Sequence, residues 1–405
     1  MTAFSPPTGP SPDASREPVP VPAAVAAVLG ADEPAGRRFT KLTHSQLTQA
    51  TGGVWRVSGP AGSVVLKVCG AGAPAGPGGA PGTAGRSKDG ADPRGWDHGR
   101  REPLAYREGL TATAFASAGI VGPELLASEE RADGSFALWL EDVSGVPGPS
   151  WTVDRLDAFA QSLGAAQAQW VDRVPDQPWL SRGWLRQYVA SKDLPAHISW
   201  DHPTAVAVWP APLRAGLRRM WDRRELLLSA AESGPRTLCH LDVWPLNLLA
   251  TGEPVGIRAG AEGGTKAGAA PGPAGGGPHT VLLDWAFVGE GGVGEDIANL
   301  IPDCVTDGLM PASLLPEIAE AVLAGYLEGL RQGGHRSDEG ALRRAVAAAG
   351  AAKYCWLTPV MLTRLAAGQP AGSPTYDVGG DDESVLRRFQ GLLEHLVRWS
   401  EQTLS

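Results

Sequence analysis

The order of hydrophobic and polar residues along the chain predicts strands first and helices later. Residues 53–57 and 63–68 are rich in β-branched and apolar side chains and flank a Ser-Gly-Pro-Ala-Gly turn, which predicts a β-hairpin. Residues 102–118 carry apolar side chains at helical spacing. Residues 123–127 and 136–140 read as two further strands around an Asp-Gly turn. The first part of the chain is therefore predicted to be a small β-rich unit with one helix.

Beyond residue 152 the apolar positions recur mainly with the helical period. The predicted helices cover residues 153–170, 213–231, 314–330, 342–355 and 384–404. The pattern indicates an α+β protein of two lobes, a small β-rich N-lobe over residues 37–141 and a larger, mainly helical C-lobe over residues 142–405. A chain of 405 residues is long enough for each lobe to bury its own core.

Three segments rich in glycine, proline and alanine interrupt this pattern. They cover residues 1–36, about 70–95 and about 253–278. Each holds too few apolar side chains to offset the entropy lost on ordering the backbone. We expect the first to be a disordered tail and the other two to be surface insertions, the last one leaving the fold from a hairpin between two strands.

Composition and charge exclude several classes of partner. The formal net charge of −9 argues against binding to nucleic acid, which needs clustered Lys and Arg. No apolar run approaches the roughly 20 residues needed to span a bilayer, and we expect a cytoplasmic protein without a membrane partner. The four cysteines show no CxxC spacing, so we expect reduced thiols and no zinc site. The sequence leaves the oligomeric state open.

The strongest chemical signal is the segment LCHLDVWPLNLL, residues 238–249. His240, Asp242 and Asn247 fit the pattern HxDxxxxN of kinase catalytic loops. The chain contains only two asparagines, so finding one by chance at this offset from a His-x-Asp is roughly a one-in-several-hundred event. The alternative is a helix-capping aspartate beside a core histidine.

Two further residues fit a nucleotide site. Asp284 ends the apolar run TVLLD, where a carboxylate is costly unless it is paired or binds a metal, and with Asn247 it makes a magnesium site. Lys67 lies in the apolar strand VVLKV, from which it can pair with phosphates. The partner expected for Lys67 is a glutamate on the next helix, either Glu102, which we favour, or Glu108. Alone, Asp284 also fits a hydrogen-bonded strand end, and Lys67 a solvated edge-strand lysine.

The motifs LKV, the Arg-Glu helix, LWLEDV, HLDVWPLN, LLDW and GVGEDIANL occur in the order of the aminoglycoside phosphotransferase family. The chain resembles this family, whose small-molecule kinases have a protein-kinase-like fold, over most of residues 48–300. The resemblance implies ATP and Mg²⁺ as cofactors, with Asn247 and Asp284 as magnesium ligands. It implies Asp242 as the base on the acceptor hydroxyl, His240 as a brace of the loop and Asp296 as a structural anchor.

The resemblance also implies a nucleotide cleft between the lobes. Backbone groups of the linker at Leu140, Glu141 and Val143 would hold the adenine. The glycine loop is reduced to TGGVW, so phosphate contacts near Gly52 and Gly53 are the weaker part of the likeness. The chain also departs from the family at Leu241, where the family often has glycine, and in the long insertion between Asn247 and Asp284.

The function implied is transfer of the γ-phosphoryl group of ATP or GTP to a hydroxyl of a small molecule, such as an aminoglycoside-like compound, a sugar or an amino alcohol. Acidic residues such as Glu290, Asp303 and Asp307 could attract a cationic acceptor. The main alternative is a nucleotide-binding pseudokinase with a regulatory role. A dinucleotide-binding oxidoreductase is suggested by GEGGVG, but Glu295 and Asp296 follow at the helix start, where a pyrophosphate needs positive charge. A metal hydrolase is the weakest of the enzyme options, because no second histidine or carboxylate has suitable local spacing.

Overall fold

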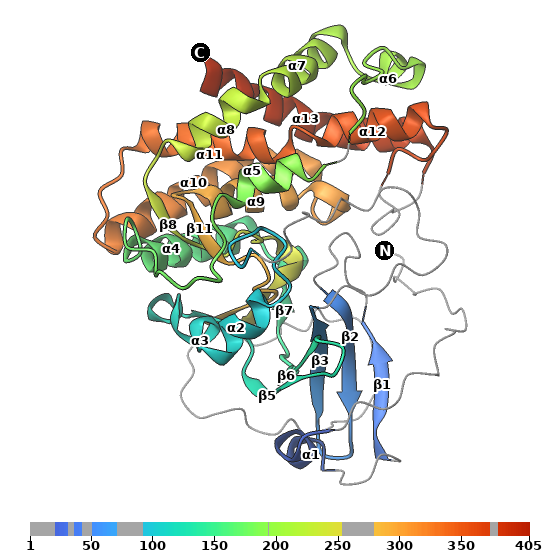
Figure 1. Cartoon of the computed structure of the whole chain (residues 1–405). Coiled ribbons are helices and arrows are strands. Elements are labelled where there is room, and N and C mark those ends of the chain that lie inside the picture. The colour runs from blue at the N-terminus through green and yellow to red at the C-terminus, as the bar shows by residue number, and fades with distance from the viewer. Residues whose placement is uncertain are drawn as a thin grey trace, which may run out of the picture.

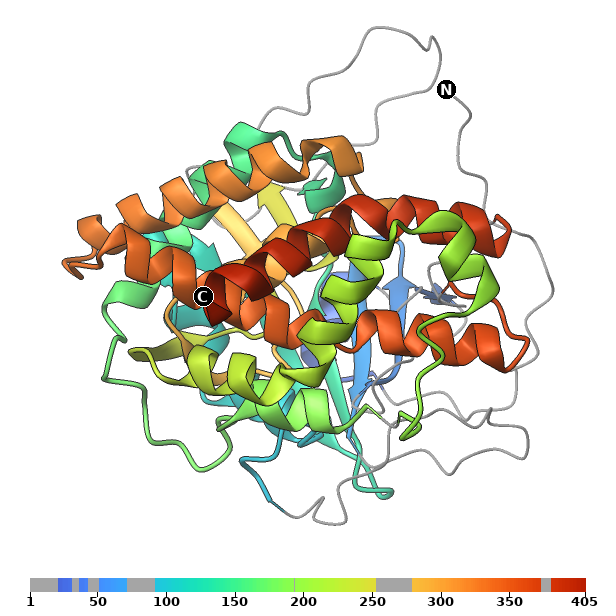
Figure 2. The same ribbon diagram turned by 90° about the horizontal axis from the view of Figure 1, so that it is seen from above.

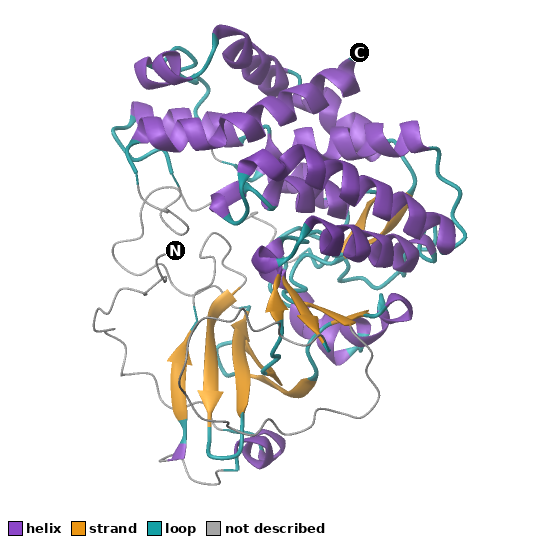
Figure 3. Ribbon diagram, turned by 180° about the vertical axis from the view of Figure 1, so that it is seen from behind, coloured by secondary structure: helices purple, strands orange, loops and turns teal. Residues whose placement is uncertain are grey.

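The computed structural model describes residues 21–30, 36–42, 51–70, 92–192, 194–252, 279–372 and 380–405. Strands of the first half gather at one end of the molecule, and helices of the second half fill the other end (Figures 1 and 3). Short strands lie between these two parts. The predicted α+β class with a β-rich first lobe and a helical second lobe is confirmed.

The strands are β1 (Arg38–Lys41), β2 (Thr51–Ser58), β3 (Ser63–Cys69), β4 (Ile120–Val121), β5 (Leu125–Glu130), β6 (Phe136–Glu141), β7 (Val146–Pro147), β8 (Arg236–Cys239), β9 (Leu248–Thr251), β10 (His279–Leu282) and β11 (Gly289–Gly292). The α-helices are α1 (Ala23–Leu29), α2 (Arg101–Arg107), α3 (Leu110–Thr113), α4 (Val153–Ala168), α5 (Trp184–Ala190), α6 (Pro203–Val208), α7 (Ala211–Asp222), α8 (Arg224–Glu232), α9 (Glu295–Asp303), α10 (Leu315–Gln332), α11 (Glu339–Tyr354), α12 (Leu357–Ala366) and α13 (Asp382–Leu404). Short 3-10 turns lie between several of them.

The N-lobe sheet has the strand order β1-β2-β3-β6-β5, and all its neighbouring strands are antiparallel. The predicted hairpin is β2 and β3, and Val54 lies opposite Lys67 in its register. Alternation along β3 buries Val64, Leu66 and Val68 in the small core of this lobe, together with Trp139 of β6.

The prediction of a disordered tail over residues 1–36 is wrong for the helix α1. Val25 and Leu29 of this helix are fully buried against the N-lobe sheet, where they join the core formed by Val64 and Trp139. Gly30 ends the helix in the left-handed conformation, with φ of +64°. Burying two aliphatic side chains offsets part of the entropy lost on ordering this short helix. Residues 1–20 and 31–35 lie outside the described residues, as do residues 71–91 and 253–278 of the two predicted insertions.

The single helix predicted over residues 102–118 is divided into α2, α3 and a 3-10 turn. Gly109 lies between α2 and α3 with φ of +74°, a left-handed conformation that ends the first helix. The helix predicted over residues 213–231 is likewise two helices, α7 and α8, which meet at Arg223. Apolar periodicity persists through both breaks because each pair of helices still faces one core.

The C-lobe is built around α4 and α10, which pack closely enough that Gly164, Gly325 and Gly329 have no room for a Cβ. The last helix, α13, crosses the other helices of this lobe (Figure 2). Residues 339–366 are long and apolar enough to cross a membrane, but 78% of their most apolar window is buried in the C-lobe. The apolar character of this stretch is therefore explained by its burial in the core of the C-lobe.

A small sheet has the strand order β4-β10-β9-β7, and its strands lie between the two lobes (Figures 1 and 3). Its strands β9 and β10 adjoin Asn247 and Asp284. β9 and β10 are antiparallel, and Thr251 is paired with His279 at their open end. The segment 253–278 therefore connects two paired strands, as the sequence predicted. Strands β8 and β11 form a separate antiparallel pair. β8 is followed by the HxDxxxxN segment, and β11 is followed by α9.

Candidate active site

The loop that follows β8 is fixed by Asp296 at the start of α9. The Asp296 carboxylate is fully buried and accepts hydrogen bonds from the backbone amides of His240 at 2.9 Å and Leu241 at 2.7 Å. Gln167 of α4 donates a third hydrogen bond at 2.7 Å and is itself held by the Tyr326 hydroxyl. Such a satisfied buried network holds the loop in one conformation. This geometry fits the anchoring role expected of Asp296.

Leu241 has a left-handed backbone with φ of +67°. This conformation costs roughly 1 to 2 kcal/mol for a residue with a Cβ, which explains why glycine suits the position. The short hydrogen bond from the Leu241 amide to Asp296 holds the strained residue in place. The sequence departure at this position is therefore accommodated.

His240 lies behind the loop and is fully buried. Its ring meets Trp285 edge-on at 5.1 Å between centroids. Burial lowers the pKa of His240 to about 4, although the Asp284 carboxylate acts in the opposite direction. His240 is therefore neutral at ordinary pH, which suits a brace of the loop better than an acid or base.

Asp242 and Asn247 contact each other directly. The Asn247 side-chain amide donates to the Asp242 backbone carbonyl and to its Oδ2, both at 3.0 Å. Because the Nδ2 protons are committed in this way, the Asn247 Oδ1 is left as the available acceptor. Burial raises the pKa of Asp242 to about 7, and the nearby Lys353 ammonium opposes this shift. A carboxyl group that titrates near neutral pH suits proton transfer.

Asp284 follows β10 and is brought beside Asn247 by the backbone. The Leu283 amide donates to the Asn247 carbonyl at 2.8 Å, which continues the pairing of β9 with β10. Asp284 has a left-handed backbone with φ of +60°, and its side chain is 34% exposed. Its carboxylate is turned toward the N-lobe and contacts Lys67.

Lys67 joins the two lobes electrostatically. Its Nζ lies 2.6 Å from Oε2 of Glu102 on α2 and 2.9 Å from Oδ1 of Asp284. Burial would lower the pKa of Lys67, but the carboxylates of Asp284 and Glu102 outweigh it and raise the pKa well above the usual value. The choice between the two glutamates is thereby decided geometrically, because Glu108 instead accepts a hydrogen bond from the Trp179 indole at 2.9 Å.

Sequence reasoning missed Arg101, which is fully buried beside Glu102. Its guanidinium donates to the backbone carbonyls of Trp179 at 2.8 Å and Ala286 at 3.0 Å. It also donates to carbonyls in the segment before α2, those of Pro93, Gly95 and Trp96. Arg101 thus ties α2 to the loop after Asp284. The sequence offers only the Arg-Glu pair as a signal, because the acceptors are backbone carbonyls that no motif marks.

Gly52 and Gly53 lie at the start of β2, close to Lys67 on the paired strand. Gly53 has φ of +154°, and a Cβ there would come within 2.2 Å of the Trp55 ring. Glycine is therefore required at this position by backbone and neighbour alike. The residues before Thr51 lie outside the described part of the chain.

The linker after β6 offers few free backbone groups. Leu140 is buried, and the Glu141 amide donates to the Glu124 carbonyl at 3.0 Å. Within the described residues the Val143 amide donates to no acceptor. Val143 is thus the best placed of the three predicted linker residues to donate to an adenine ring.

The oxygen atoms of Asn247 and Asp284 suit Mg²⁺, which prefers hard oxygen ligands. Among the described residues, no group of three or more His, Cys, Asp or Glu side chains could hold a metal ion. A magnesium ion at Asn247 and Asp284 would therefore take its remaining ligands from phosphate oxygens and water. No observation favours the metal hydrolase alternative.

The glycine-rich GEGGVG segment is a packing element. β11 is antiparallel to β8, and a Cβ at Gly289 would lie within 2.4 Å of the Ser181 backbone. The Glu295 carboxylate accepts a hydrogen bond from the Gly292 amide at 2.7 Å at the start of α9. Space and charge both disfavour a pyrophosphate here, which argues against the dinucleotide-binding alternative.

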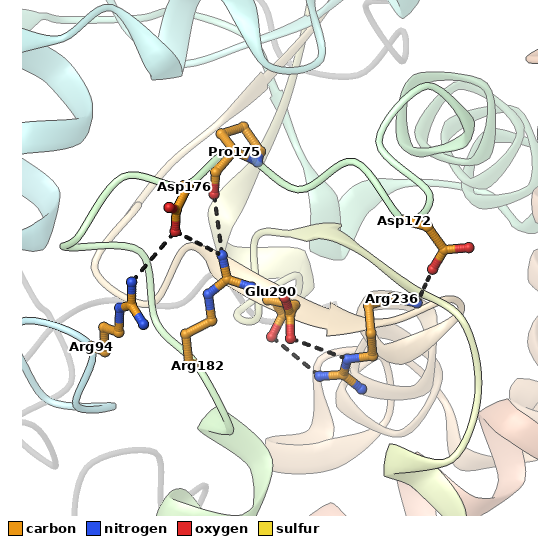
Figure 4. A network of polar contacts seen from close by, with 7 residues as sticks. All are labelled: Arg94, Asp172, Pro175, Asp176, Arg182, Arg236 and Glu290. Carbon is orange, nitrogen blue, oxygen red and sulfur yellow. Dashed lines mark hydrogen bonds and ion pairs between the residues drawn. The ribbon is translucent and has the colours of Figure 1, made fainter.

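Glu290 is neutralised by arginines and cannot serve as an open site for a cation. Its carboxylate pairs with Arg182 and lies 3.7 Å from Arg236 (Figure 4). Arg182 in turn lies 3.8 Å from Asp176. The expectation that Glu290 attracts a cationic acceptor is therefore unsupported.

No protein-family model matches the sequence, and no curated protein sequence does. Solved structures do match the fold. A microcompartment-associated aminopropanol kinase superposes with a TM-score of 0.52 at 15% identity, covering 95% of this chain and 98% of that chain. The amicoumacin kinase hAmiN in complex with AMP-PNP, Ca²⁺ and Ami gives 0.49 at 15% identity, covering 91% of each chain.

A choline/ethanolamine kinase family protein from Mesorhizobium loti gives a TM-score of 0.48 at 17% identity, covering 95% of this chain and 98% of that chain. Identities this low establish architecture and not activity. The match to the aminopropanol kinase structure covers nearly the whole of both chains. The chain has the two-lobed protein-kinase-like fold.

Proposed function

We propose that this protein is a magnesium-dependent phosphotransferase that moves the γ-phosphoryl group of ATP to a hydroxyl of a small molecule. The observation that carries the proposal is that side chains from both lobes contact one another at a single site. Lys67 and Glu102 from the N-lobe meet Asp284, which lies beside Asn247 and the Asp242 loop of the C-lobe. The fold shared with the aminopropanol kinase structure supports the same class of reaction.

The residues divide into two roles. Lys67, held by Glu102, would contact the α- and β-phosphates, and the Val143 amide would donate to the adenine. Asn247 Oδ1 and Asp284 would hold Mg²⁺, which neutralises charge developing on the β- and γ-phosphates. For this, Asp284 must exchange part of its contact with Lys67 for the ion.

Asp242 would act on the acceptor. As the acceptor oxygen attacks the γ-phosphorus, its proton passes to the Asp242 carboxylate, and the bond from the γ-phosphorus to the oxygen bridging to the β-phosphate breaks, so that ADP leaves. The hydrogen bond from Asn247 fixes the orientation of Asp242. His240, neutral and buried, would support the loop without exchanging a proton.

The proposal is tested with purified protein in two steps. Calorimetry measures ATP and GTP binding with magnesium and with excess chelator, and coupled ADP release then measures turnover with hydroxylated compounds. We expect nucleotide binding that needs magnesium, and ADP formation that needs an acceptor. Equal turnover in excess chelator contradicts the proposal. Nucleotide binding with no turnover on any acceptor supports the pseudokinase alternative.

A further inference from the structure

Two lysines of the C-lobe lie on one cluster of aromatic rings. Lys192, just after α5, places its Nζ 3.7 Å from the centroid of Tyr188 and 4.3 Å from that of Trp356. Lys353, at the end of α11, places its Nζ 4.8 Å from Trp184 and 5.7 Å from Tyr188. The two ammonium groups therefore share the ring of Tyr188. We call these five residues the lysine cluster.

The lysine cluster is rich in hydrogen-bond donors that have no acceptor. Within the described part of the chain, neither lysine forms an ion pair or a hydrogen bond through its ammonium group. The buried indole N–H groups of Trp184 and Trp356 also have no partner. Lys353 as a whole residue is 7% exposed. Unpaired buried donors of this kind are costly, and two buried indole N–H groups beside two ammonium groups that form no ion pair are unusual for packing alone.

The pKa values of both lysines are lowered from the usual value. Burial, together with the weaker effect of the Lys353 ammonium, lowers the pKa of Lys192 to about 7. Burial also lowers the pKa of Lys353, although four carboxylates oppose this, those of Asp303, Asp242, Glu295 and Asp296. Cation–π contacts offset part of the cost, but they do not relieve repulsion between two cations on one ring. An anion bound between the two lysines would relieve this repulsion.

The lysine cluster is tied to the catalytic loop. The Tyr354 hydroxyl, next to Lys353, donates to the Asn299 Oδ1 at 3.2 Å, and Asn299 donates to the Val243 carbonyl at 2.7 Å. Val243 directly follows Asp242. The Trp184 ring also contacts the ring of Phe287, with 5.6 Å between the two centroids. Phe287 lies three residues beyond Asp284 in the sequence. A small molecule with its hydroxyl at Asp242 would therefore extend toward Lys353.

We infer that the lysine cluster is the acceptor-recognition site, and that the acceptor carries an anionic group, a carboxylate or a phosphate, in addition to its hydroxyl. The inference rests on the proposed phosphotransfer and names its substrate class. A carboxylate or phosphate group accepts hydrogen bonds and donates none, so it matches a set of donors that have no hydrogen-bond partner. A contact between an ammonium group and a carboxylate or phosphate is also a strong, charge-assisted hydrogen bond. A cationic acceptor would instead place another positive charge beside these lysines.

The test compares acceptors that differ mainly in charge. The sets are ethylene glycol, ethanolamine and glycolate; glycerol, glycerate and glycerol phosphate; and glucose, glucosamine and glucuronate. We expect kcat/KM for the anionic members to exceed that of the neutral members by about tenfold, with the cationic members lowest. Glycerate against glycerol phosphate separates carboxylate from phosphate. The same assays are run on Lys192→Gln, Lys353→Gln, Lys192→Arg and, as a matched control, Lys41→Gln on the exposed strand β1.

Each glutamine variant of the lysine cluster should lower the anionic-to-neutral ratio of kcat/KM by about tenfold, while Lys192→Arg and Lys41→Gln keep it. Retained magnesium-ADP affinity shows that a variant is folded. A preference of the wild type for neutral or cationic members, or an unchanged ratio in both glutamine variants, overturns the inference and leaves the phosphotransferase proposal intact. Failure of the wild type to bind magnesium-ATP overturns the phosphotransferase proposal itself.

If no compound in the sets is phosphorylated, the binding of sulfate tests whether the lysine cluster binds an anion. Sulfate is titrated calorimetrically into protein saturated with magnesium-ADP, which occupies the nucleotide site. We expect heat of binding in the wild type and in Lys41→Gln, and its loss in Lys192→Gln and Lys353→Gln. Absence of sulfate binding in the wild type, or equal binding in the glutamine variants, contradicts the inference.

Discussion

Lys67 and Asp284 form an ion pair of 2.9 Å between Nζ and Oδ1 that links the N-lobe strand β3 to the C-lobe loop after β10. Glu102 holds the same ammonium from the other side at 2.6 Å. The Lys67 ammonium thereby offsets the cost of the partial burial of the Asp284 carboxylate. Binding of magnesium and nucleotide would redistribute these charges without leaving any of them unpaired.

Asp284→Asn should weaken magnesium-ADP binding by about tenfold or more and lower turnover as well. The amide keeps the shape of the side chain but removes the negative charge that attracts the ion. Calorimetry with and without magnesium measures the effect. Binding of free ADP should change little, and a variant whose magnesium-ADP affinity equals that of the wild type would show that Asp284 does not hold the ion.

Glu102→Gln should lower kcat/KM by about tenfold, because Lys67 then loses its buried carboxylate partner and its orientation toward the phosphates. Glu108→Gln on the same helical segment is the matched control, since glutamine can still accept the hydrogen bond of the Trp179 indole. Steady-state kinetics of the two variants should differ. Equal losses would mean that the Lys67–Glu102 pair has no special role.

Arg101→Lys should lower the free energy of unfolding by about 3 kcal/mol, because a lysine cannot reach carbonyls on three separate segments and leaves them buried without donors. Arg100→Lys changes the neighbouring residue, which is exposed and pairs with Glu130, and should cost less than about 1 kcal/mol. Urea unfolding measures both. A similar small loss in the two variants would contradict the bridging role of Arg101.

Much of the fold was predictable because local patterns and tertiary contacts agree. The β-branched and apolar residues of β2 and β3 placed Lys67 on a strand of a hairpin, as the structure has it. The candidate catalytic residues from His240 to Asn247 lie close together in the sequence at a fixed spacing. The break at Gly109 was missed because apolar spacing continues across it. Glu102 and Glu108 could not be separated by sequence, since the distinction depends on how α2 is docked.

Contacts between distant segments were the least predictable. Arg101 uses backbone carbonyls as partners, and carbonyls carry no sequence signal. The lysine cluster joins α5 to the end of α11, so neither Lys192 nor Lys353 is distinctive within its own segment. The small helix α1 was missed because its surroundings are rich in proline, although Val25 and Leu29 are both fully buried.

The most direct test of the account is the turnover of Asp242→Asn with an acceptor that the wild type phosphorylates. Asparagine can still accept the hydrogen bond from Asn247, so the loop should fold as before, but it cannot take a proton from the acceptor hydroxyl. We predict unchanged magnesium-ATP affinity and a turnover lower by about a hundredfold or more. Phosphoryl transfer by Asp242→Asn at the wild-type rate would contradict the assignment of this loop as the catalytic centre.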